Sequence, residues 1–433
     1  MSAFLFKQFR QNIAVTNSDA ISSSYSKITK RLNSDFWDID SDSAHCLQVG
    51  SYGRNTAIRD VSDLDMVFEL PRSVYDRLSK VIGNGPSQLL QEVRDSLKRT
   101  YPNTKIKGDG QVVVVDFAKY RVEVLPAFKQ DDGRYRYGDT HNDGSWENYC
   151  NPRAEIDAIN TQNKISNRNL KHVCKMLRAW KNHNGAPMSG MLIDTLAHNF
   201  FKSNDSYNEK SYAAYPDLMR DVFSYLANQP EQEYWRAPGS LSHVKTKGKF
   251  QRKAKRAAVK CQDAIDEEKE SKKVKLWKEI FGRRFPTVTE QIAKAFGETT
   301  QRVSTEEFIE DKYLVDIQYD LDTECIVGYA GKEEKRYRFM EGVFPWLKLG
   351  RNLTFRVVSC NVPQPYQVFW KVRNVGAAAE RKNEIRGQIL PDGGSLRRVE
   401  TTSFGGEHYV ECYVVKDGIC VARNLIEVPI ELT

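Results

Sequence analysis

The hydrophobic pattern of this chain changes its period twice, and this feature constrains the fold more than any other. Residues 1–150 mix helical spacing with short apolar runs, and residues 151–305 carry mainly the three-to-four-residue spacing of helices. From residue 313 to residue 433, apolar and polar residues alternate in short runs separated by Pro and Gly. The sequence therefore predicts an α+β domain, a helical domain and an all-β domain, in that order.

Within the first region, short apolar runs predict strands and two segments carry apolar residues at helical spacing. The predicted strands are 64–70, 112–117 and 120–128, and the predicted helices are 73–83 and 86–102. Residues 45–53 are a short, strand-like apolar stretch that ends in Gly-Ser-x-Gly. Only Ala118-Lys119 separates the last two strands, which predicts a tight hairpin.

The clearest helix of the second region is predicted over residues 167–185. Its apolar stripe consists of Leu170, Val173, Cys174, Leu177 and Trp180, and Asn184-Gly185 supplies a stop signal. The opposite side carries Lys171, Lys175 and Arg178 in a row. Further along, residues 245–260 contain eight Lys or Arg residues and no acid, which fits either a basic binding face or a solvated helix or loop.

Alternating runs in the third region predict an all-β sandwich. The predicted strands are 313–321, 352–359, 367–374, 384–389, 408–424 and 425–432. Lys416-Asp417-Gly418 predicts a hairpin turn inside the fifth run, because Asp-Gly favours the backbone conformation of tight turns.

Composition narrows the classes of protein to consider. The 433 residues are 40% hydrophobic and 28% charged, which is typical of folded globular proteins. No uncharged apolar stretch approaches the roughly 18 residues of a membrane span, so we expect a cytoplasmic protein with no membrane partner. The eight cysteines lack metal-binding spacing, and the net charge of +8 favours anionic partners such as nucleotides or nucleic acid.

Two carboxylates and a glycine-serine turn carry the candidate chemistry. Asp63 and Asp65 are one residue apart, so on a strand their side chains point to the same face and could share divalent ions. A surface strand with alternating acids would give the same pattern. Gly50-Ser51, however, ends an apolar run twelve residues upstream, where small residues let backbone N–H groups approach phosphate oxygens. A phosphate-binding site beside a metal-binding site favours nucleotidyl transfer. Two metal ions and a third carboxylate would support this reaction.

The segment GSYGRNTAIRDVSDLDMVFEL resembles the signature of the DNA polymerase beta-like nucleotidyltransferase superfamily. Within it, YRVEVLPAF resembles the strand that carries the third carboxylate in oligoadenylate synthases and bacterial relatives of cyclic GMP-AMP synthase. The resemblance implies that Asp63, Asp65 and Glu123 are catalytic and bind two Mg²⁺ ions, with Mn²⁺ as a substitute. The family more often has Asp at the third position, and Asp116 on the neighbouring run is the alternative ligand.

The same resemblance extends to the cationic helix. LKHVCKMLRAW resembles the helix that holds the donor triphosphate in oligoadenylate synthases, which implies that Lys175 and Arg178 bind nucleotide together with Gly50 and Ser51. Lys171 lies one turn earlier. The following PMSGMLIDTLAHNFF resembles the next family helix, which implies that Ser189 approaches the donor. A solvated helix face would also explain the cations.

The all-β region resembles the AGS-C sensor domain that is fused to bacterial cyclases and second-messenger nucleotidyltransferases. Trp370, Asn374, Gly376, Arg386 and Gly387 carry this match. A core aromatic and a turn glycine would also explain Trp370 and Gly376. The resemblance implies a regulatory ligand at this domain. Together, the two resemblances identify the chain as similar to the bacterial cGAS/DncV-like nucleotidyltransferases, or CD-NTases, which make cyclic oligonucleotides in anti-phage signalling.

Two other functions remain open at this stage. The same half-reaction could give a linear oligonucleotide or a nucleotidylated nucleic acid, and the basic segment 245–260 supports this alternative. A catalytically silent nucleotide sensor is the other hypothesis. Three clustered carboxylates argue against a silent sensor, because their mutual repulsion is costly without metal ions.

Overall fold

The computed structural model describes residues 2–59, 63–287, 306–329, 332–337, 346–374, 386–403 and 405–431. The chain forms two compact units that interleave along the sequence. The first contains Met1–Arg178, Gly190–Tyr225 and Gln232–Lys245, and the second contains Ala179–Ser189, Leu226–Glu231 and Thr246–Thr433. The predicted domain bounds 1–150, 151–305 and 313–433 stay predictions. None of the described helices is long and apolar enough to cross a bilayer.

A seven-stranded sheet forms the centre of the first unit. Five of its strands lie in the order β1 (Cys46–Gln48), β2 (Asp63–Glu69), β5 (Arg121–Lys129), β4 (Val112–Asp116) and β3 (Lys105–Asp109). β6 (Tyr135–Asp139) pairs with the end of β5 and with β7 (Ser145–Cys150). β2 and β5 are parallel. The predicted hairpin is confirmed, because β4 and β5 are antiparallel and the Phe117 N–H donates to the Tyr120 carbonyl across the turn.

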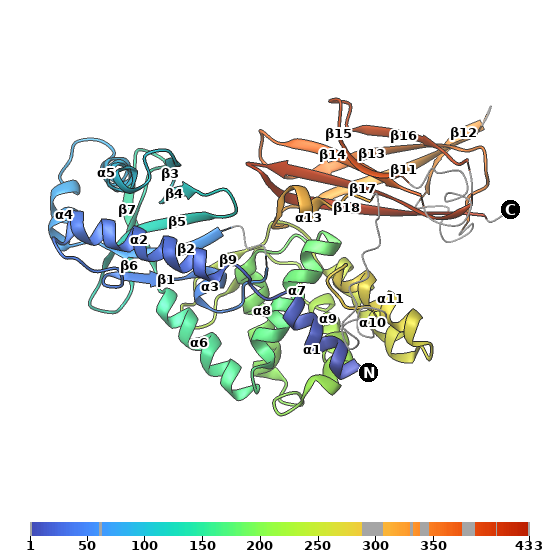
Figure 1. Ribbon diagram of the computed structural model, residues 1–433, viewed down its shortest axis with the longest axis horizontal. Helices are drawn as coiled ribbons and strands as arrows, with labels where there is room; N and C mark the ends of the chain where they lie inside the picture. Colours follow the sequence, from blue (N-terminus) through green and yellow to red (C-terminus); the bar gives the residue numbers. More distant parts are fainter. Residues whose placement is uncertain are drawn as a thin grey trace. The chain divides into compact units, whose positions relative to one another are not determined.

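One face of this sheet is covered by helices. Figure 1 shows α2 (Ser18–Phe36) and α5 (Gly85–Thr100) beside the strands, with α4 (Arg72–Leu78) at the edge. Even-numbered strand residues such as Leu64, Met66 and Val124 pack against these helices. The Asn84 side chain accepts a hydrogen bond from the Ser87 N–H and caps α5. Because strand residues alternate between faces, odd-numbered residues of β2 and β5 point away from this core.

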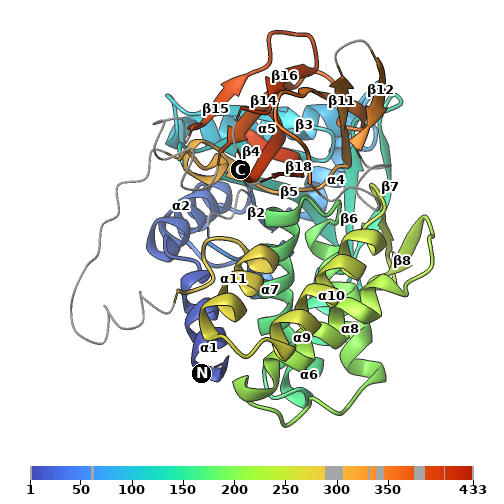
Figure 2. The same ribbon diagram turned by 90° about the vertical axis from the view of Figure 1, so that its right-hand side faces the viewer.

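Helices make up the rest of the first unit. They are α1 (Ser2–Asn12), α3 (Gly50–Gly53), α6 (Pro152–Ile165), α7 (Asn169–Asn184), α8 (Gly190–Ser203), η1 (Tyr212–Ala214) and α9 (Tyr215–Ala227), with the ribbon β8 (Tyr234–Arg236) and β9 (His243–Lys245). The predicted helix over 167–185 is confirmed, and its apolar stripe is fully buried. α6 and α8 run side by side (Figure 2). The last six residues of α7 belong to the second unit.

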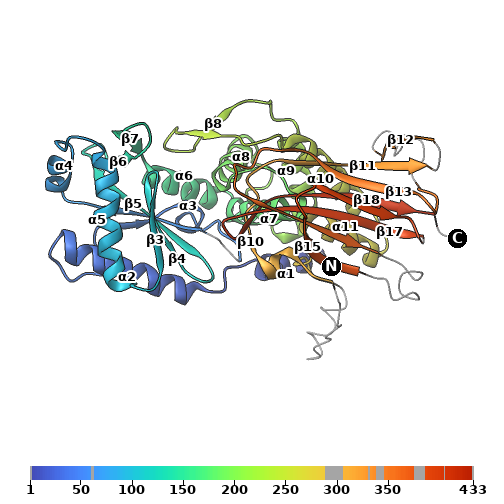
Figure 3. The same cartoon turned by 90° about the horizontal axis from the view of Figure 1, so that it is seen from above.

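Two packed sheets form the all-β part of the second unit, which confirms the predicted sandwich. One sheet has the order β10 (Leu314–Val315), β18 (Ile419–Ile430), β17 (Gly406–Lys416), β14 (Gln367–Arg373) and β15 (Arg386–Pro391). The other has the order β12 (Lys332–Arg336), β11 (Leu321–Tyr329), β13 (Asn352–Cys360) and β16 (Arg397–Thr401). Strands of the two sheets run alongside each other (Figure 3). Phe355 of one sheet and Trp370 of the other share one core.

The turn between β17 and β18 has the predicted form, since Asp417 and Gly418 both have positive φ. The predicted strand over 313–321 was wrong in extent, because only Leu314 and Val315 form a strand before β11 begins at Leu321. Val315, on the edge strand β10, and Ile317, just after it, are both buried with Tyr413 and Cys420 on the outer face of this sheet, so the alternation continues beyond the short strand. β11 and β16 were not predicted.

Among the described residues, three further helices belong to the second unit: α10 (Gln251–Asp266), α11 (Glu270–Phe281) and α13 (Ile309–Lys312). α10 and α11 lie side by side and bury Cys261 and Trp277. α10 contains most of the predicted basic segment 245–260, so that segment is largely helical rather than a loop.

Candidate functional site

The three predicted catalytic carboxylates lie on two neighbouring strands of the first unit. In the parallel register of β2 and β5, Asp65 is the partner of Glu123 and Asp63 is the partner of Arg121. All three acids have odd numbers, so they share the face of the sheet opposite the α2 and α5 core. The register therefore brings Asp65 and Glu123 side by side, although 58 positions separate them in the sequence.

The pKa of Glu123 reflects the negative charges around it. Burial, followed by the charges of Asp63 and Asp65, raises the pKa of this carboxyl to about 7. Each of these effects disfavours a third negative charge at the site. The arrangement is therefore one that a bound cation would stabilise.

Arg121 lies at the same face and separates Asp116 from the other acids. Its Nε atom is 3.4 Å from Asp63 Oδ1 and 3.6 Å from Asp116 Oδ1. Asp116 is the register partner of Arg121 on β4, whereas the partner of Glu123 on β4 is Val114. Since Glu123 is directly beside Asp65, the geometry favours Glu123 over Asp116 as the third acid.

The glycine-serine turn contacts the carboxylates directly. Gly50 begins α3 with a φ of +63°, and a Cβ atom added there would lie 1.7 Å from Asp65 Oδ2. The Val49 N–H donates to the Asp65 carbonyl at 2.9 Å. Ser51 follows within α3, half-buried, and its carbonyl accepts hydrogen bonds from the N–H groups of Thr56 and Ala57. The two motifs recognised in the sequence thus form one site, in which Gly50 leaves room for Asp65.

A buried acid that the sequence reasoning missed holds the segment after this turn. Asp194 on α8 is fully buried, and its Oδ2 atom accepts hydrogen bonds from Arg54 Nε and Thr56 Oγ1, both at 2.9 Å. Burial by itself would raise the pKa of Asp194, but Arg178 and Arg54 lower it to about 2. An acid inside the apolar run MLIDTLAHNFF is the signal that could have pointed to it.

Arg178 is the second cation of this buried group. Its Nη1 atom is 2.6 Å from Asp194 Oδ1 and its Nη2 atom is 3.0 Å from Asp194 Oδ2. Nη2 also donates to the Gly190 carbonyl, and 5% of the residue is exposed. Arg178 therefore has a structural role that joins α7 to α8. Its predicted contact with a triphosphate stays a prediction.

Lys175, one turn earlier, lies next to the glycine-serine segment. Its Nζ atom donates to Asn55 Oδ1 at 3.2 Å, and Lys171 Nζ donates to Asn160 Oδ1 at 2.6 Å. Burial and the positive charges of Arg10, Arg178 and Lys171 lower the pKa of Lys175 to about 8. A cluster of cations favours an anion at this point. Arg10, on α1, was not singled out in the sequence.

Ser189 directly precedes α8 and is half-buried. It belongs to the second unit, whereas Gly50, Ser51 and Lys175 belong to the first. Its predicted approach to the donor nucleotide stays a prediction.

The carboxylates fit a divalent cation by their donor chemistry. Mg²⁺ prefers oxygen ligands, which Asp63, Asp65 and Glu123 supply. Among the residues that the structure describes, no three His, Cys, Asp or Glu side chains are gathered closely enough to hold a metal ion as they stand. Binding would require these side chains to turn toward one another and Glu123 to ionise.

The basic segment divides between the interior and the surface of the second unit. Lys253 Nζ donates to the Gly185 carbonyl at 2.6 Å, and Lys260 forms an ion pair with Glu279 at 2.8 Å. Arg252, Lys255 and Arg256 are exposed on one side of α10. Only part of the segment is therefore available as a basic face.

Three of the residues that carry the resemblance of the all-β region have structural roles. Trp370 is in the sandwich core, and its Nε1 atom donates to Asp392 at 3.0 Å. Arg386 pairs with Glu400, at 2.5 and 3.1 Å. Gly387 has a positive φ and faces Glu306, so a side chain there would be crowded. Asn374 follows β14, and Gly376 lies outside the described residues.

Two family models and one curated relative match this chain. Residues 2–163 match the Second Messenger Oligonucleotide or Dinucleotide Synthetase (SMODS) domain, and residues 303–431 match the Adenylyl/Guanylyl and SMODS C-terminal sensor (AGS-C) domain. A cyclic AMP-AMP-AMP synthase from Acinetobacter is 23% identical over 253 residues, which cover 56% of this chain and 73% of that protein.

Solved structures with a similar fold include CdnC of Escherichia coli MS115-1 in complex with HORMA-deltaN, with a TM-score of 0.47, 15% identity and coverage of 66% of this chain and 98% of that chain. Another is CdnG of Bradyrhizobium diazoefficiens in complex with GTP, with a TM-score of 0.48, 12% identity and coverage of 68% and 97%. The apo form of Vibrio cholerae DncV has a TM-score of 0.44, 15% identity and coverage of 56% and 69%. These scores are all below 0.5, so the assignment rests on the two domains and the Acinetobacter relative.

The SMODS match over residues 2–163, which include the sheet with its carboxylates beside a glycine-serine turn, identifies a nucleotidyltransferase. The chain thus carries the two domains of a cGAS/DncV-like nucleotidyltransferase (CD-NTase) with a sensor, a SMODS domain over residues 2–163 and an AGS-C domain over residues 303–431.

Proposed function

We propose that this enzyme makes a cyclic di- or trinucleotide from nucleoside triphosphates in an Mg²⁺-dependent reaction that releases pyrophosphate. The observation that carries the proposal is the register of β2 and β5, which pairs Asp65 with Glu123 next to Gly50. The Acinetobacter relative, whose name states a cyclic trinucleotide product, supports the ring. The proposal includes a cytoplasmic role in anti-phage signalling, as in other CD-NTases.

Each group of residues has a defined task in this proposal. Asp63, Asp65 and Glu123 would hold the metal ions, which when bound lower the pKa of the attacking hydroxyl and neutralise the triphosphate. Ser51 and the backbone N–H groups at the start of α3 would bind phosphate oxygens, since the first N–H groups of a helix lack partners within it. Lys175 would add a positive charge beside the same segment.

The donor and acceptor react in line once both are held. The acceptor hydroxyl attacks the α-phosphorus of the donor, an O–P bond forms, and the bond to the β-phosphate oxygen breaks, which releases pyrophosphate. A final intramolecular round closes the ring. Positioning of the two nucleotides supplies much of the acceleration, because it converts an encounter of separate molecules into a reaction within one complex.

The test is incubation of the purified protein with labelled nucleoside triphosphates and Mg²⁺ or Mn²⁺. Phosphatase treatment then separates linear from cyclic products, since a ring has no terminal phosphate. We expect a phosphatase-resistant species that a 3′-5′ or 2′-5′ specific nuclease converts to mononucleotides. The double variant Asp63→Asn, Asp65→Asn should give none, and the same product from that variant would refute the site.

A second candidate is synthesis of a linear product or transfer to a nucleic acid, and the exposed cations on α10 favour it. Arg252, Lys255 and Arg256 would contact phosphates of RNA or DNA. The triple alanine variant should then weaken binding and reduce the slope of log K against log salt by about 2 to 3. Lys260→Ala, whose cation is paired with Glu279, is the control. Equal binding by both variants and the wild type would reject this candidate.

A further inference from the structure

The outer face of the five-stranded sheet carries charged residues that are buried. Lys371, Glu411 and Arg423 lie on β14, β17 and β18 and are 1%, 4% and 5% exposed. Lys371 is the register partner of Glu411, and its Nζ atom is 3.1 Å from Glu411 Oε2. Arg423 also donates to Glu411. These charges lie on the face away from the sandwich core, so a second layer must cover them.

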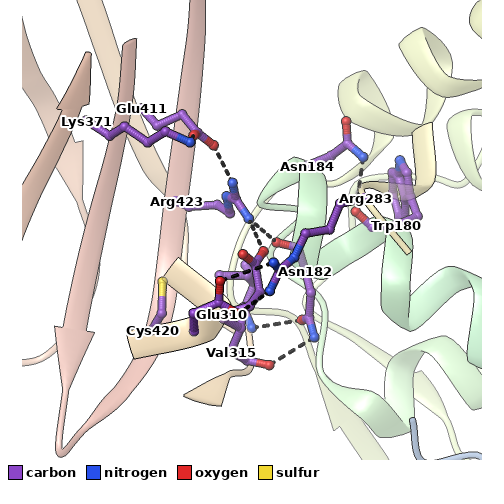
Figure 4. A network of polar contacts seen from close by, with 12 residues as sticks. Trp180, Asn182, Asn184, Arg283, Glu310, Val315, Lys371, Glu411, Cys420 and Arg423 are labelled. Carbon is purple, nitrogen blue, oxygen red and sulfur yellow. Dashed lines mark hydrogen bonds and ion pairs between the residues drawn. The ribbon is translucent and has the colours of Figure 1, made fainter. Parts of the chain in front are cut away.

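The end of α7 supplies part of that layer, as Figure 4 shows. Arg423 Nη1 donates to the Asn182 carbonyl at 3.2 Å and to Glu310 Oε1 at 3.0 Å. The Asn182 side chain donates to the Val315 carbonyl at 2.9 Å and accepts from the Ile317 N–H at 3.3 Å. The last turn of α7 is thus fixed to β18 on one side and to the segment before β11 on the other.

The loop that follows α7 is held by the same unit. Lys181 Nζ is 2.5 Å from Asp316 Oδ1 and donates to the Met188 carbonyl at 3.1 Å. A Cβ atom at Gly185 would lie 2.1 Å from the Arg423 carbonyl oxygen, so the loop passes directly against β18. Asn184 donates to the Ile280 carbonyl at 2.7 Å.

We propose that Asn182 and Arg423 are positioning residues for the nucleotide site, through which the C-terminal domain sets the affinity for nucleoside triphosphate. α7 is one continuous helix, with Lys175 in the first unit and Asn182 in the second. Hydrogen bonds between successive turns make a helix stiff, so a shift at Asn182 is carried to Lys175. The inference rests on the proposed triphosphate contact of Lys175.

Coupling of this kind is reciprocal. If a ligand of the C-terminal domain changes the affinity for nucleoside triphosphate by some factor, the nucleotide changes the affinity for that ligand by the same factor. The buried ion pairs give this coupling a physical route, because Arg423 donates at once to Glu411, Glu310 and the Asn182 carbonyl. A redistribution among them would alter how firmly the end of α7 is held.

The test compares two alanine variants that each lose one donated and one accepted hydrogen bond in the second unit. Asn182→Ala removes the bonds to Val315 and Ile317. Asn361→Ala, the matched control, removes bonds to Lys247 and Asp320 and has no contact with α7 among those described. Amide hydrogen exchange over residues 170–178 and the kinetics with ATP are measured for both.

We expect Asn182→Ala to speed exchange at 170–178 by about tenfold, because two hydrogen bonds of ordinary strength are lost, and to raise KM severalfold with little change in kcat. Asn361→Ala should change neither, even if both variants lower Tm equally. Faster exchange confined to residues 180–184, with 170–178 unchanged, would overturn the inference. The exchange measurement does not depend on catalysis. An inactive wild type would therefore refute the proposed function, while the exchange data would still decide the coupling.

Discussion

At the scale of single residues, Gly50 is the position where the site tolerates least change. Its positive φ disfavours any side chain, and Asp65 Oδ2 occupies the space that a Cβ atom would need. Gly133 has a similar φ of +81° but has nothing within 4 Å of an added Cβ atom. The two glycines therefore separate the cost of backbone conformation from the cost of the contact.

Gly50→Ala should lower kcat/KM by about a hundredfold, the effect of displacing a reacting group by about 1 Å. Gly133→Ala should cost only the backbone strain, about 1 to 2 kcal/mol of unfolding free energy, with activity retained. Steady-state kinetics and urea unfolding of both variants check this. Similar activity in the two variants would show that the contact of Gly50 with Asp65 is unimportant.

Asp194 is a buried acid whose ionisation contributes to stability. Its pKa is lowered to about 2 in the folded protein, against about 4 in an unfolded chain. A lowered pKa stabilises the fold fully above the unfolded value, and that contribution is lost as pH falls through about 2. The size of this contribution is roughly 2 to 3 kcal/mol.

Asp194→Asn should reduce the unfolding free energy at pH 7 by roughly 3 to 5 kcal/mol, since Arg178 and Arg54 would keep buried charges without their acid. Urea unfolding should be measured between pH 7 and pH 2.5. The difference in unfolding free energy between variant and wild type should become smaller below about pH 4. Asp217→Asn, which breaks a half-exposed pair with Arg220, should cost at most about 1 kcal/mol. A difference for Asp194→Asn that is constant with pH would contradict the assignment.

At the scale of elements, α7 has different tasks on its different sides. The apolar stripe fixes the helix in the core, Arg178 joins it to α8, and Lys175 lies beside the segment after α3. Only the last of these leaves a charge near the proposed phosphate site. The helix therefore provides both a buried support and a binding group.

The lowered pKa of Lys175 predicts a pH dependence of nucleotide binding. The amine loses its proton as pH rises through about 8, so the Kd for a non-hydrolysable ATP analogue should rise between pH 7.5 and pH 9.5. Lys175→Ala should weaken binding about tenfold or more at pH 7. Calorimetric titration at several pH values measures both effects.

Lys175→Arg is the informative control, because an arginine side chain keeps its charge throughout this range. Its binding should stay nearly constant from pH 7.5 to pH 9.5. A wild type that is equally flat would mean that Lys175 does not contact the triphosphate.

At the scale of the whole molecule, the two units interleave along the chain, so the second unit includes segments from the middle of the sequence as well as its C-terminal part. Residues 179–189 belong to the second unit, where Lys181 contacts Asp316 and Asn182 contacts Val315. The first unit continues after this segment with α8. Truncation before the sandwich therefore removes the partners of a segment in the middle of the helical region.

A chain that ends at residue 305 should lose protection at the end of α7. Amide hydrogen exchange at 180–185 should become at least about tenfold faster than in the full chain, because each lost hydrogen bond contributes roughly 1 kcal/mol, and Tm should fall. Exchange mass spectrometry and thermal unfolding of both chains check this. Unchanged protection at 180–185 would show that these contacts contribute little in solution.

The sequence by itself determined the features that depend on local pattern. Alternation along β2 and β5 fixed which face carries Asp63, Asp65 and Glu123, and the apolar stripe of α7 fixed which side is buried. The sandwich and its Asp417-Gly418 turn followed from the same local rules. These predictions succeed because side-chain direction repeats with the period of the element.

Only the tertiary structure decided which distant residues meet. Asp194 accepts hydrogen bonds from Arg54 and Thr56, which lie about 140 positions earlier in the chain. No local sequence pattern encodes that pairing. Arg178, which the sequence predicts at a helix surface, is buried because it forms an ion pair with the buried Asp194. The basic segment likewise divides at Lys253, whose partner is the carbonyl of Gly185. Long-range pairing of charges, rather than residue type, determines which of these cations remain available to bind a ligand.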